Sequence, residues 1–357
     1  MARIQPLLQR VEDAHLRFAS VPILPDVATR LEREVVVSSV FGTNTIEGGT
    51  LTEEETAAVI DTEIAKEEKE KRVLNIMRAY SKAEGFAAAC AKVTTVSPDE
   101  HGLAIVLREA MLKDLHAIIT EDLAHSQNLP GQYRDNQKGQ YTPPKCRDDI
   151  EILVKEYLEW MNSPELSQLS PLIRAPLAHY YFERIHPFWD GNGRVGRVLE
   201  AMALKCAGYK YAPFALSRYY LEHIDEYFAV FNLARKAEEN KEHYPNTVFV
   251  EFFLKGMLSV LNILHDRVNR IIAILLYESS LNVKLQNKNI NMRQFMIVNN
   301  LLSHGVEHQL TNVQAQTWYQ LLYRKLTTKT RTRDLKGLVE ERLIAITDDK
   351  TLILLVP

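Results

Sequence analysis

The sequence has few cysteines, no long apolar run and no large excess of charge of one sign. Its three cysteines, Cys90, Cys146 and Cys206, are too few and too far apart for a disulfide framework or a cysteine metal site. No uninterrupted apolar stretch approaches the roughly 18 residues that a membrane span needs. The first residues also lack the apolar stretch of a secretory signal. We therefore expect reduced thiols, a cytoplasmic location and no membrane partner.

The charges nearly cancel, with 43 Lys and Arg against 46 Asp and Glu. Such a balance argues against a generally basic nucleic-acid binder, although a local basic patch stays open. Apolar residues make up 46% and charged residues 25%, which is typical of soluble globular proteins and excludes a disordered chain or a coiled-coil rod. The length of 357 residues suggests two or three domains.

Helical periodicity dominates the chain. Apolar residues recur at i, i+3/i+4 and i+7 along residues 173–181, 195–206 and 253–275, as on the buried face of a helix. Prolines and glycines separate these segments. Two β-prone runs, 343–346 and 351–354, flank an acidic turn and predict a terminal hairpin, whereas Tyr133–Tyr141 reads as a small hairpin or a plain loop. The chain is therefore predicted to be mainly α up to about residue 280, with a small α+β unit after it.

The C-terminal unit is similar to a winged helix. Residues 291–357 predict helices over 292–303, 311–325 and 330–341, followed by the hairpin. Residues 324–336 hold six basic side chains and one acid, so a nucleic-acid contact through them is conceivable. Winged helices also serve as protein-binding modules, and we favour a protein partner over nucleic acid.

One loop carries a pattern that suggests chemistry. Pro187 disfavours helical geometry at His186, so one helix is expected to end there and another to begin near Gly193 or Arg194. Glycines and a helix N-terminus together favour anions, and the two arginines at 194 and 197 can face that site because they are three residues apart. Asp190 could bind Mg²⁺ and His186 could accept a proton. Alternatively, the segment is a common Asp-Gly-Asn-Gly turn that binds nothing.

Residues 186–197 resemble the Fic motif, His-x-Phe-x-Asp/Glu-Gly-Asn-Gly-Arg-x-x-Arg, at every defined position. The resemblance implies a Fic-type helical bundle and a protein adenylyltransferase, which moves AMP from Mg-ATP onto a Ser, Thr or Tyr hydroxyl of a target protein. It makes His186 the general base, Asp190 the Mg²⁺ ligand and Phe188 core support. It also implies nucleotide contacts along the start of the second helix, at Gly191, Asn192, Gly193, Arg194, Val195, Gly196 and Arg197.

A second resemblance lies upstream. Residues 43–48 match the family's inhibitory motif, Ser/Thr-x-x-x-Glu-Gly/Asn, with Thr43, Glu47 and Gly48 at its defined positions. Thr43 and Glu47 are four residues apart and share a helix face. The resemblance implies that Glu47 pairs with Arg197 where the γ-phosphate of ATP would bind. On its own, this hexapeptide could equally be a surface helix that stops at two glycines.

Two further segments resemble the family more weakly. Residues 131–144 are similar to the flap hairpin that aligns the target, with Lys138, Gly139 and Gln140 as candidate contacts, although the usual alternating apolar residues are missing. Downstream, Tyr227 and Arg235 fit the helices near the nucleotide. The residues of both segments could instead be packing or surface residues.

The resulting prediction has three domains. Residues 1–110 form an N-terminal helical region with an inhibitory helix near 26–48, residues 111–280 a Fic catalytic core with a small flap hairpin, and residues 285–357 a small α+β winged-helix-like domain. The cofactors implied are ATP and Mg²⁺, and a homodimer stays open. Removal of AMP at the same site, transfer of a different phosphate-linked group and a nucleotide-sensing DNA-binding regulator are the alternatives.

Overall fold

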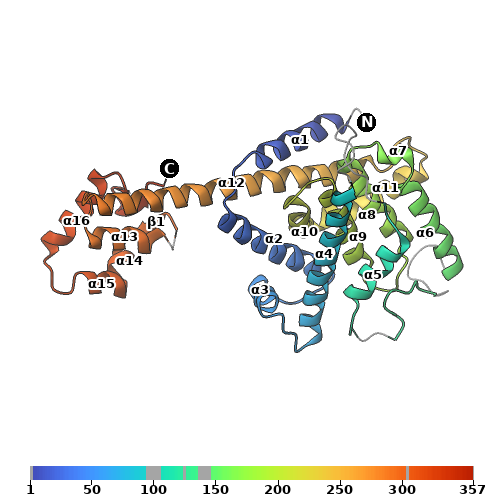
Figure 1. The fold of residues 1–357 in the computed structure, drawn as a ribbon, viewed down its shortest axis with the longest axis horizontal. Coiled ribbons are helices and arrows are strands. Elements are labelled where there is room, and N and C mark those ends of the chain that lie inside the picture. The colour runs from blue at the N-terminus through green and yellow to red at the C-terminus, as the bar shows by residue number, and fades with distance from the viewer. Residues whose placement is uncertain (1–2, 94–105, 124–125, 136–145, 303–304, 357) are drawn as a thin grey trace. The chain divides into compact units, whose positions relative to one another are not determined.

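The computed structural model describes residues 3–93, 106–123, 126–135, 146–302 and 305–356. The chain forms two compact units, Met1–His265 and Asp266–Pro357. Both are mainly helical, and helix α12 (Thr247–Gln286) contains the boundary between them (Figure 1).

The described residues of the first unit form helices and no strands. In chain order these are α1 (Gln5–Ala19), α2 (Pro25–Ile46), α3 (Glu53–Thr62), α4 (Glu68–Val93), α5 (Glu109–Ile119), α6 (Arg147–Met161), α7 (Pro164–Ser167), α8 (Pro171–Ile185), α9 (Asn192–Cys206), α10 (Ala212–Glu222) and α11 (Ile224–Glu239), followed by the first part of α12. The expected mainly helical fold is therefore observed.

Helices α8 and α9 form the centre of the first unit. The Ser170 hydroxyl caps the start of α8, and Pro171 follows at a position where its missing N–H costs nothing. Side chains on both helices, such as Phe182 and Val198, are fully buried. Their close approach depends on Gly196, because a Cβ there would lie 2.7 Å from the His179 ring. This pair of helices holds the loop 186–191 between two rigid elements.

Helix α2 is also part of the core. Its residues Val27, Leu31, Val35 and Val40 are buried, and each such side chain contributes about 1.5–3 kcal/mol of transfer free energy. A Cβ on Gly42 would lie 2.7 Å from the backbone of Ser217, so α2 and α10 touch backbone to backbone.

The second unit combines the last part of α12 and four further helices with a small sheet. Helices α13 (Met292–Leu302), α14 (Leu310–Ala315), α15 (Thr317–Leu322) and α16 (Thr328–Glu340) alternate with strands β1 (Glu307–Gln309), β2 (Ile344–Ile346) and β3 (Thr351–Leu354). The sheet order is β1-β3-β2, with both pairs antiparallel. Val298, Tyr319, Leu338 and Leu352 lie in its buried core.

One prediction for this unit was wrong, and another was confirmed but incomplete. The single helix expected over 311–325 is broken at Gln316, whose backbone is extended at φ −67° and ψ 140°. The hairpin expected near the C-terminus exists, but β1 adds a third strand along β3. Strand β1 is short and polar, so its sequence has no apolar alternation that could have indicated it.

Helix α12 is long and apolar enough to cross a membrane, by length and composition only. The search for an uninterrupted apolar run missed it, since polar residues such as Asn262 and His265 interrupt the apolar ones. In its most apolar window, 56% of the residues are buried inside the protein, as they are in a core helix of a soluble protein.

Candidate functional site

The loop between α8 and α9 turns sharply at His186. This residue has φ 50° and ψ 59°, a left-handed conformation that side chains other than glycine seldom adopt. The Arg134 side chain holds the turn, because its Nε donates to the His186 carbonyl at 2.8 Å, while the Arg134 backbone N–H donates to the Pro187 carbonyl at 2.9 Å. The segment before residue 136 is thereby tied to the loop.

Asn192 determines which nitrogen of His186 carries the proton. The Asn192 Oδ1 accepts from the Phe188 N–H at 2.9 Å, and its Nδ2 donates to the Phe188 carbonyl at 2.8 Å, so the amide cannot be flipped. The same Nδ2 lies 2.9 Å from His186 Nδ1 and has a second hydrogen to donate. Neutral His186 therefore accepts at Nδ1 and bears its proton on Nε2.

Phe188 packs inward and supports the loop, as expected. It is fully buried and stacks on His116 with ring centroids 3.8 Å apart. His116 Nδ1 accepts from the Gly131 N–H and its Nε2 lies 2.9 Å from the Asp190 carbonyl, so one ring joins α5, the loop and the segment after residue 130. Burial lowers the pKa of His116 to about 4, which keeps it neutral in this role.

The start of α9 is an anion site. Gly191 caps the helix at φ 89°, a backbone conformation that suits glycine, and the first N–H groups of a helix have no partner within it. Arg194 is buried and forms an ion pair with Asp190 at 2.5 Å, yet its Nε and Nη1 have no hydrogen-bond partner among the described residues. Helix dipole, free amides and an unsatisfied guanidinium all favour negative charge here.

Glu47 lies directly over this anion site. Its Oε1 is 2.7 Å from Arg197 Nη2, and the Arg197 side chain is 1% exposed against 25% for Glu47. A Cβ added to Gly193 would lie only 2.2 Å from Glu47 Oε1, so the carboxylate occupies the space above the first turn of α9. Arg72 from α4 donates to the Glu47 carbonyl at 3.0 Å and so holds the end of α2 in place.

Burial and neighbouring charges set the protonation of the site. Burial, reinforced by the Arg134 charge, lowers the pKa of His186 to about 4, so the imidazole is neutral at pH 7. Burial alone would raise the pKa of Glu47, but the charge and hydrogen bond of Arg197 hold it below the usual value for Glu. Glu183 Oε1 accepts no hydrogen bond from the residues that the structure describes, and burial with the nearby Glu47 charge raises the pKa of Glu183 to about 8.

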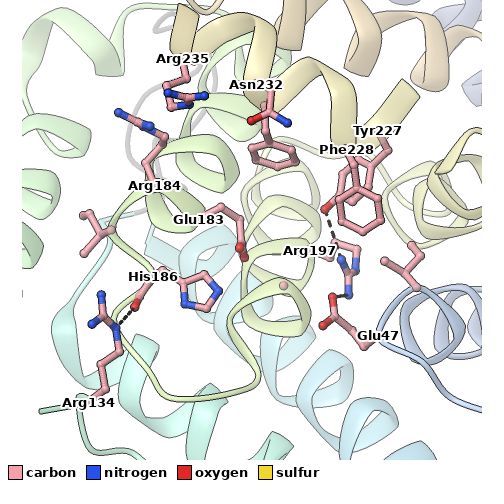
Figure 2. Close-up of a pocket in the computed structure, with 14 residues that line it drawn as sticks. Glu47, Arg134, Glu183, Arg184, His186, Arg197, Tyr227, Phe228, Asn232 and Arg235 are labelled. Carbon is pink, nitrogen blue, oxygen red and sulfur yellow. Dashed lines mark hydrogen bonds and ion pairs between the residues drawn. The ribbon is translucent and has the colours of Figure 1, made fainter. Parts of the chain in front are cut away.

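A cavity of about 490 Å³ joins these groups. Figure 2 shows Glu47 and Arg197 facing each other on one side and His186 on the other, with Glu183 between them. Among the α11 side chains that line the cavity, Tyr227 contacts Arg197, whereas Phe228 is half exposed and Arg235 forms an ion pair with Glu239.

The other residues singled out from the sequence have varied positions. Thr43 is fully buried, and its hydroxyl bonds to Ser217 and Tyr80 at 2.9 Å rather than facing the cavity. The side chain of Val195 lies in the core, and Gly196 lies against α8. Gly48 adopts φ 81° immediately after Glu47. Lys138, Gly139 and Gln140 of the expected flap lie outside the described residues.

Sequence reasoning missed several residues that shape the site. Arg134 and His116 reach the loop from other segments, and Arg72 reaches the Glu47 carbonyl. Glu183 lines the cavity with a buried Oε1 that has no partner in the described part of the chain. Only Glu183 had a local signal, since it lies one turn before His186 on the same helix.

The residues fit a magnesium nucleotide. The orphaned nitrogens of Arg194 and the space that Glu47 fills above Gly193 suit phosphate oxygens. Asp190 immediately precedes the glycine that caps α9, and its side chain is 56% exposed, so its oxygens are accessible to Mg²⁺. Within the ranges that the structure describes, no three His, Cys, Asp or Glu side chains cluster to hold a metal by themselves.

Comparisons with known proteins agree with this geometry. Residues 106–204 match the model of the Fic/DOC family. The chain is 31% identical over 183 residues to the protein adenylyltransferase Fic of Drosophila virilis, which covers 50% of this chain and 35% of that protein. It is 26% identical over 237 residues to the protein of the same name from Nematostella vectensis, and the match covers 66% of this chain and 51% of that protein. The chain thus spans about a third to a half of the length of these relatives.

Solved structures share the fold. A Fic family protein from Desulfovibrio desulfuricans G20 superposes with a TM-score of 0.55 at 20% identity, covering 99% of this chain and 96% of that chain. A Fic domain containing signaling protein from Bacteroides thetaiotaomicron VPI-5482 gives 0.60 at 16% identity, covering 73% and 97%. The chain is therefore a mainly helical Fic fold that contains a Fic/DOC family region and is distantly related to the Fic adenylyltransferases.

Proposed function

We propose that this chain transfers AMP from Mg-ATP to a hydroxyl side chain of a target protein. The observation that supports this most is a cavity lined by Gly193 of the α9 N-terminus, by Arg197 and by a neutral His186. The buried Arg194 adds a second positive charge to the same first turn of α9. Phosphoryl-type transfer requires mainly positioning and stabilisation of charge, and these groups supply both.

The reaction can be written for this chain's residues. The target oxygen attacks the α-phosphorus in line, the bond to the leaving diphosphate breaks, and the proton of the hydroxyl passes to Nε2 of His186. For this step His186 must take the other tautomer, with its ring proton on Nδ1, and so give up the hydrogen bond that Nδ1 accepts from Asn192. The α9 amides and the two arginines hold the phosphates. Asp190 would hold Mg²⁺, which when bound neutralises phosphate charge. Release of Asp190 from Arg194 would free both groups for these ligands.

We further propose that Glu47 inhibits this transfer. Its carboxylate is paired with Arg197 and fills the space above Gly193, so a phosphate cannot occupy the same position. Two anions compete for one guanidinium, and the one that is covalently attached has the higher local concentration. A triphosphate would then bind weakly or in an unproductive position until Glu47 moves.

Self-labelling with radioactive ATP tests the proposal. The Glu47→Gly chain should incorporate label more strongly than the wild type, and His186→Ala in that background should abolish incorporation. Lys155→Ala, at an exposed position of α6 that does not line the cavity, serves as a folded control. Absence of labelling by the Glu47→Gly chain, in the presence of nucleotide binding, would reject transfer of AMP.

Removal of AMP from a modified protein is a second candidate, and the His186 tautomer favours it. Because Asn192 donates to Nδ1, neutral His186 carries its proton on Nε2, the form that can protonate a leaving hydroxyl. Glu47 lies where it could orient a water toward the phosphorus. When the self-labelled Glu47→Gly chain is mixed with unlabelled wild type, the wild type should release AMP from it. The single variant His186→Ala, added in place of the wild type, should release none.

We propose that the second unit is a winged-helix-like module for a protein partner. Support comes from its order of helix, strand, helices and hairpin and from the sheet order β1-β3-β2. The basic residues of α16 are divided between exposed positions and internal contacts, since Arg331 lies over the Tyr323 ring. Duplex DNA binding by the full chain, measured by fluorescence anisotropy, would contradict the choice of a protein partner.

A further inference from the structure

Four buried polar side chains continue from Arg197 into the core as one hydrogen-bonded chain. Arg197 Nη1 donates to the Tyr227 hydroxyl at 3.2 Å, and that hydroxyl lies 3.2 Å from His179 Nε2. His179 Nδ1 lies 2.9 Å from Glu200 Oε2, and the Tyr220 hydroxyl donates to Glu200 Oε1 at 2.7 Å. The proposed transfer of AMP assigns no role to His179, Glu200 or Tyr220.

The members of this chain come from four helices, α8, α9, α10 and α11. All are at most 2% exposed. The rings of Tyr220 and Tyr227 stack with centroids 4.9 Å apart, and a Cβ on Gly196 would lie 2.7 Å from the His179 ring. Packing therefore restricts each side chain to one rotamer, and the hydrogen bonds act between fixed partners.

The donors and acceptors can be arranged in only one consistent order. A guanidinium can only donate, so the Tyr227 hydroxyl accepts from Arg197 and directs its own hydrogen to His179 Nε2. His179 then carries its proton on Nδ1 and donates it to the Glu200 carboxylate. Glu200 thus selects the His179 tautomer that leaves Nε2 free to orient Tyr227.

We propose that Tyr227, oriented by His179 and Glu200, is a positioning residue that keeps Arg197 aimed at the terminal phosphate of a bound nucleoside triphosphate. This inference rests on the proposed function. In the described part of the chain, Glu47 is the carboxylate partner of Arg197, and it must leave before a triphosphate can take its place. The Arg197 Nε has no partner among the described residues. Once Glu47 has left, two contacts within the described residues still hold the guanidinium: the Thr43 carbonyl accepts from Nη2 at 3.3 Å, and the Tyr227 hydroxyl accepts from Nη1 at 3.2 Å. Of these two, only Tyr227 acts through its side chain.

A long arginine side chain without fixed contacts loses rotational entropy when it binds an anion. The hydrogen bond to Tyr227 already restricts the Arg197 side chain in the folded protein, so less entropy is lost when nucleotide binds. The hydroxyl would therefore contribute to the affinity for a triphosphate but not for a diphosphate, whose phosphates end before Arg197. Tyr227 acts through Arg197, while the more exposed Phe228 beside it is free to face the ligand.

The test measures the affinity of Mg-ATP and Mg-ADP for Glu47→Gly chains by calorimetry. Tyr227→Phe keeps the buried ring and removes the hydroxyl, and it should weaken ATP about tenfold, the typical effect of one hydrogen bond to a charged group. ADP should change less than twofold. Tyr180→Phe is the matched control, because Tyr180 is equally buried and its hydroxyl has no hydrogen-bond partner in the described structure. It should leave both affinities unchanged.

A double-mutant cycle with Arg197→Lys shows whether the effect passes through Arg197. In that background Tyr227→Phe should weaken ATP less than twofold, because the guanidinium it positions is gone. Equal losses of ATP and ADP, or a tenfold effect of Tyr227→Phe that persists in the Arg197→Lys background, would overturn the inference. Unchanged ATP affinity in Tyr227→Phe would overturn it too, while leaving the proposed function intact.

Two variants at His179 keep the inference testable if Tyr227→Phe does not fold. His179→Gln retains an acceptor near the Nε2 position and should keep ATP affinity within threefold. His179→Leu removes the acceptor and should weaken ATP five- to tenfold, again with little change for ADP. Equal affinities in the two variants would overturn the inference. A Glu47→Gly chain that binds neither nucleotide would reject the proposed function and this inference together.

Discussion

Replacing Glu47 by Gln should lower the stability of the empty protein and increase its response to polyphosphate. The carboxylate pairs with an Arg197 side chain that is 1% exposed, and removing one partner of a buried pair costs about 3–5 kcal/mol. Glu47 itself is 25% exposed and Gln keeps an oxygen for Arg197, so we expect about 2 kcal/mol. For a unit of this size that corresponds to a decrease in Tm of about 4–8 °C.

Glu53→Gln is the matched control. Glu53 lies at the same 2.7 Å distance from Arg218, but both side chains are more than a third exposed. Exposed pairs contribute little, so this variant should lose less than about 1 kcal/mol. The comparison separates the effect of burial from the effect of ion-pair geometry.

Tripolyphosphate should reverse the loss in the Glu47 variant, because the anion can now occupy the site above Gly193. At a concentration of one hundred times Kd the stabilisation is about 2.7 kcal/mol, enough to restore the wild-type Tm. Thermal melts of wild type, Glu47→Gln and Glu53→Gln, with and without tripolyphosphate, measure all of these effects. Equal destabilisation of the two variants, or an equal response of all three proteins to the anion, would refute the reasoning.

Three further predictions concern protonation and metal. Because burial lowers the pKa of His186 to about 4, self-labelling by Glu47→Gly should vary less than about threefold between pH 6 and 8.5, and a steep loss from pH 7 to 6 would contradict this. Burial raises the pKa of Glu183 to about 8, so the native state keeps a proton that the unfolded chain releases above pH 4.5, and stability falls as pH rises toward 8. At about 1.4 kcal/mol per pH unit, Glu183→Gln should therefore gain up to about 4 kcal/mol relative to wild type between pH 5 and 8.5 in urea unfolding, whereas a constant difference would count against it. Asp190→Asn should raise the Mg²⁺ concentration for half-maximal labelling about tenfold, and an unchanged midpoint would remove its metal role.

The parts of the site that could be predicted from the sequence depend on neighbouring residues. Pro187 indicated the end of α8, and the structure ends that helix at Ile185. The glycines indicated a turn into a second helix, which begins at Asn192, one or two residues before the expected start. The hairpin near the C-terminus was indicated by two apolar runs around a turn. These features follow from the backbone preferences of a few adjacent residues.

The parts that could not be predicted depend on residues far apart in the chain. Arg134 reaches the His186 carbonyl across 52 positions, and nothing in its own segment indicates that contact. Tyr227 was expected near the nucleotide because of a family resemblance, whereas its hydrogen bonds to Arg197 and His179 require the packing of α8, α9 and α11. Side-chain pairing of this kind is determined by tertiary structure, and periodicity carries no information about it.

The contact between Gly42 and the Ser217 backbone limits how the site can be switched on. Even one added methyl group would collide there, so the middle of α2 cannot slide or lift without opening the centre of the unit. Only the segment that follows α2 can move, because the helix ends at Ile46 and Gly48 adopts φ 81° just after it. An activator would accordingly need to displace a few atoms at residues 46–48, and a truncation that deletes the whole helix should yield an unfolded chain instead of a hyperactive one.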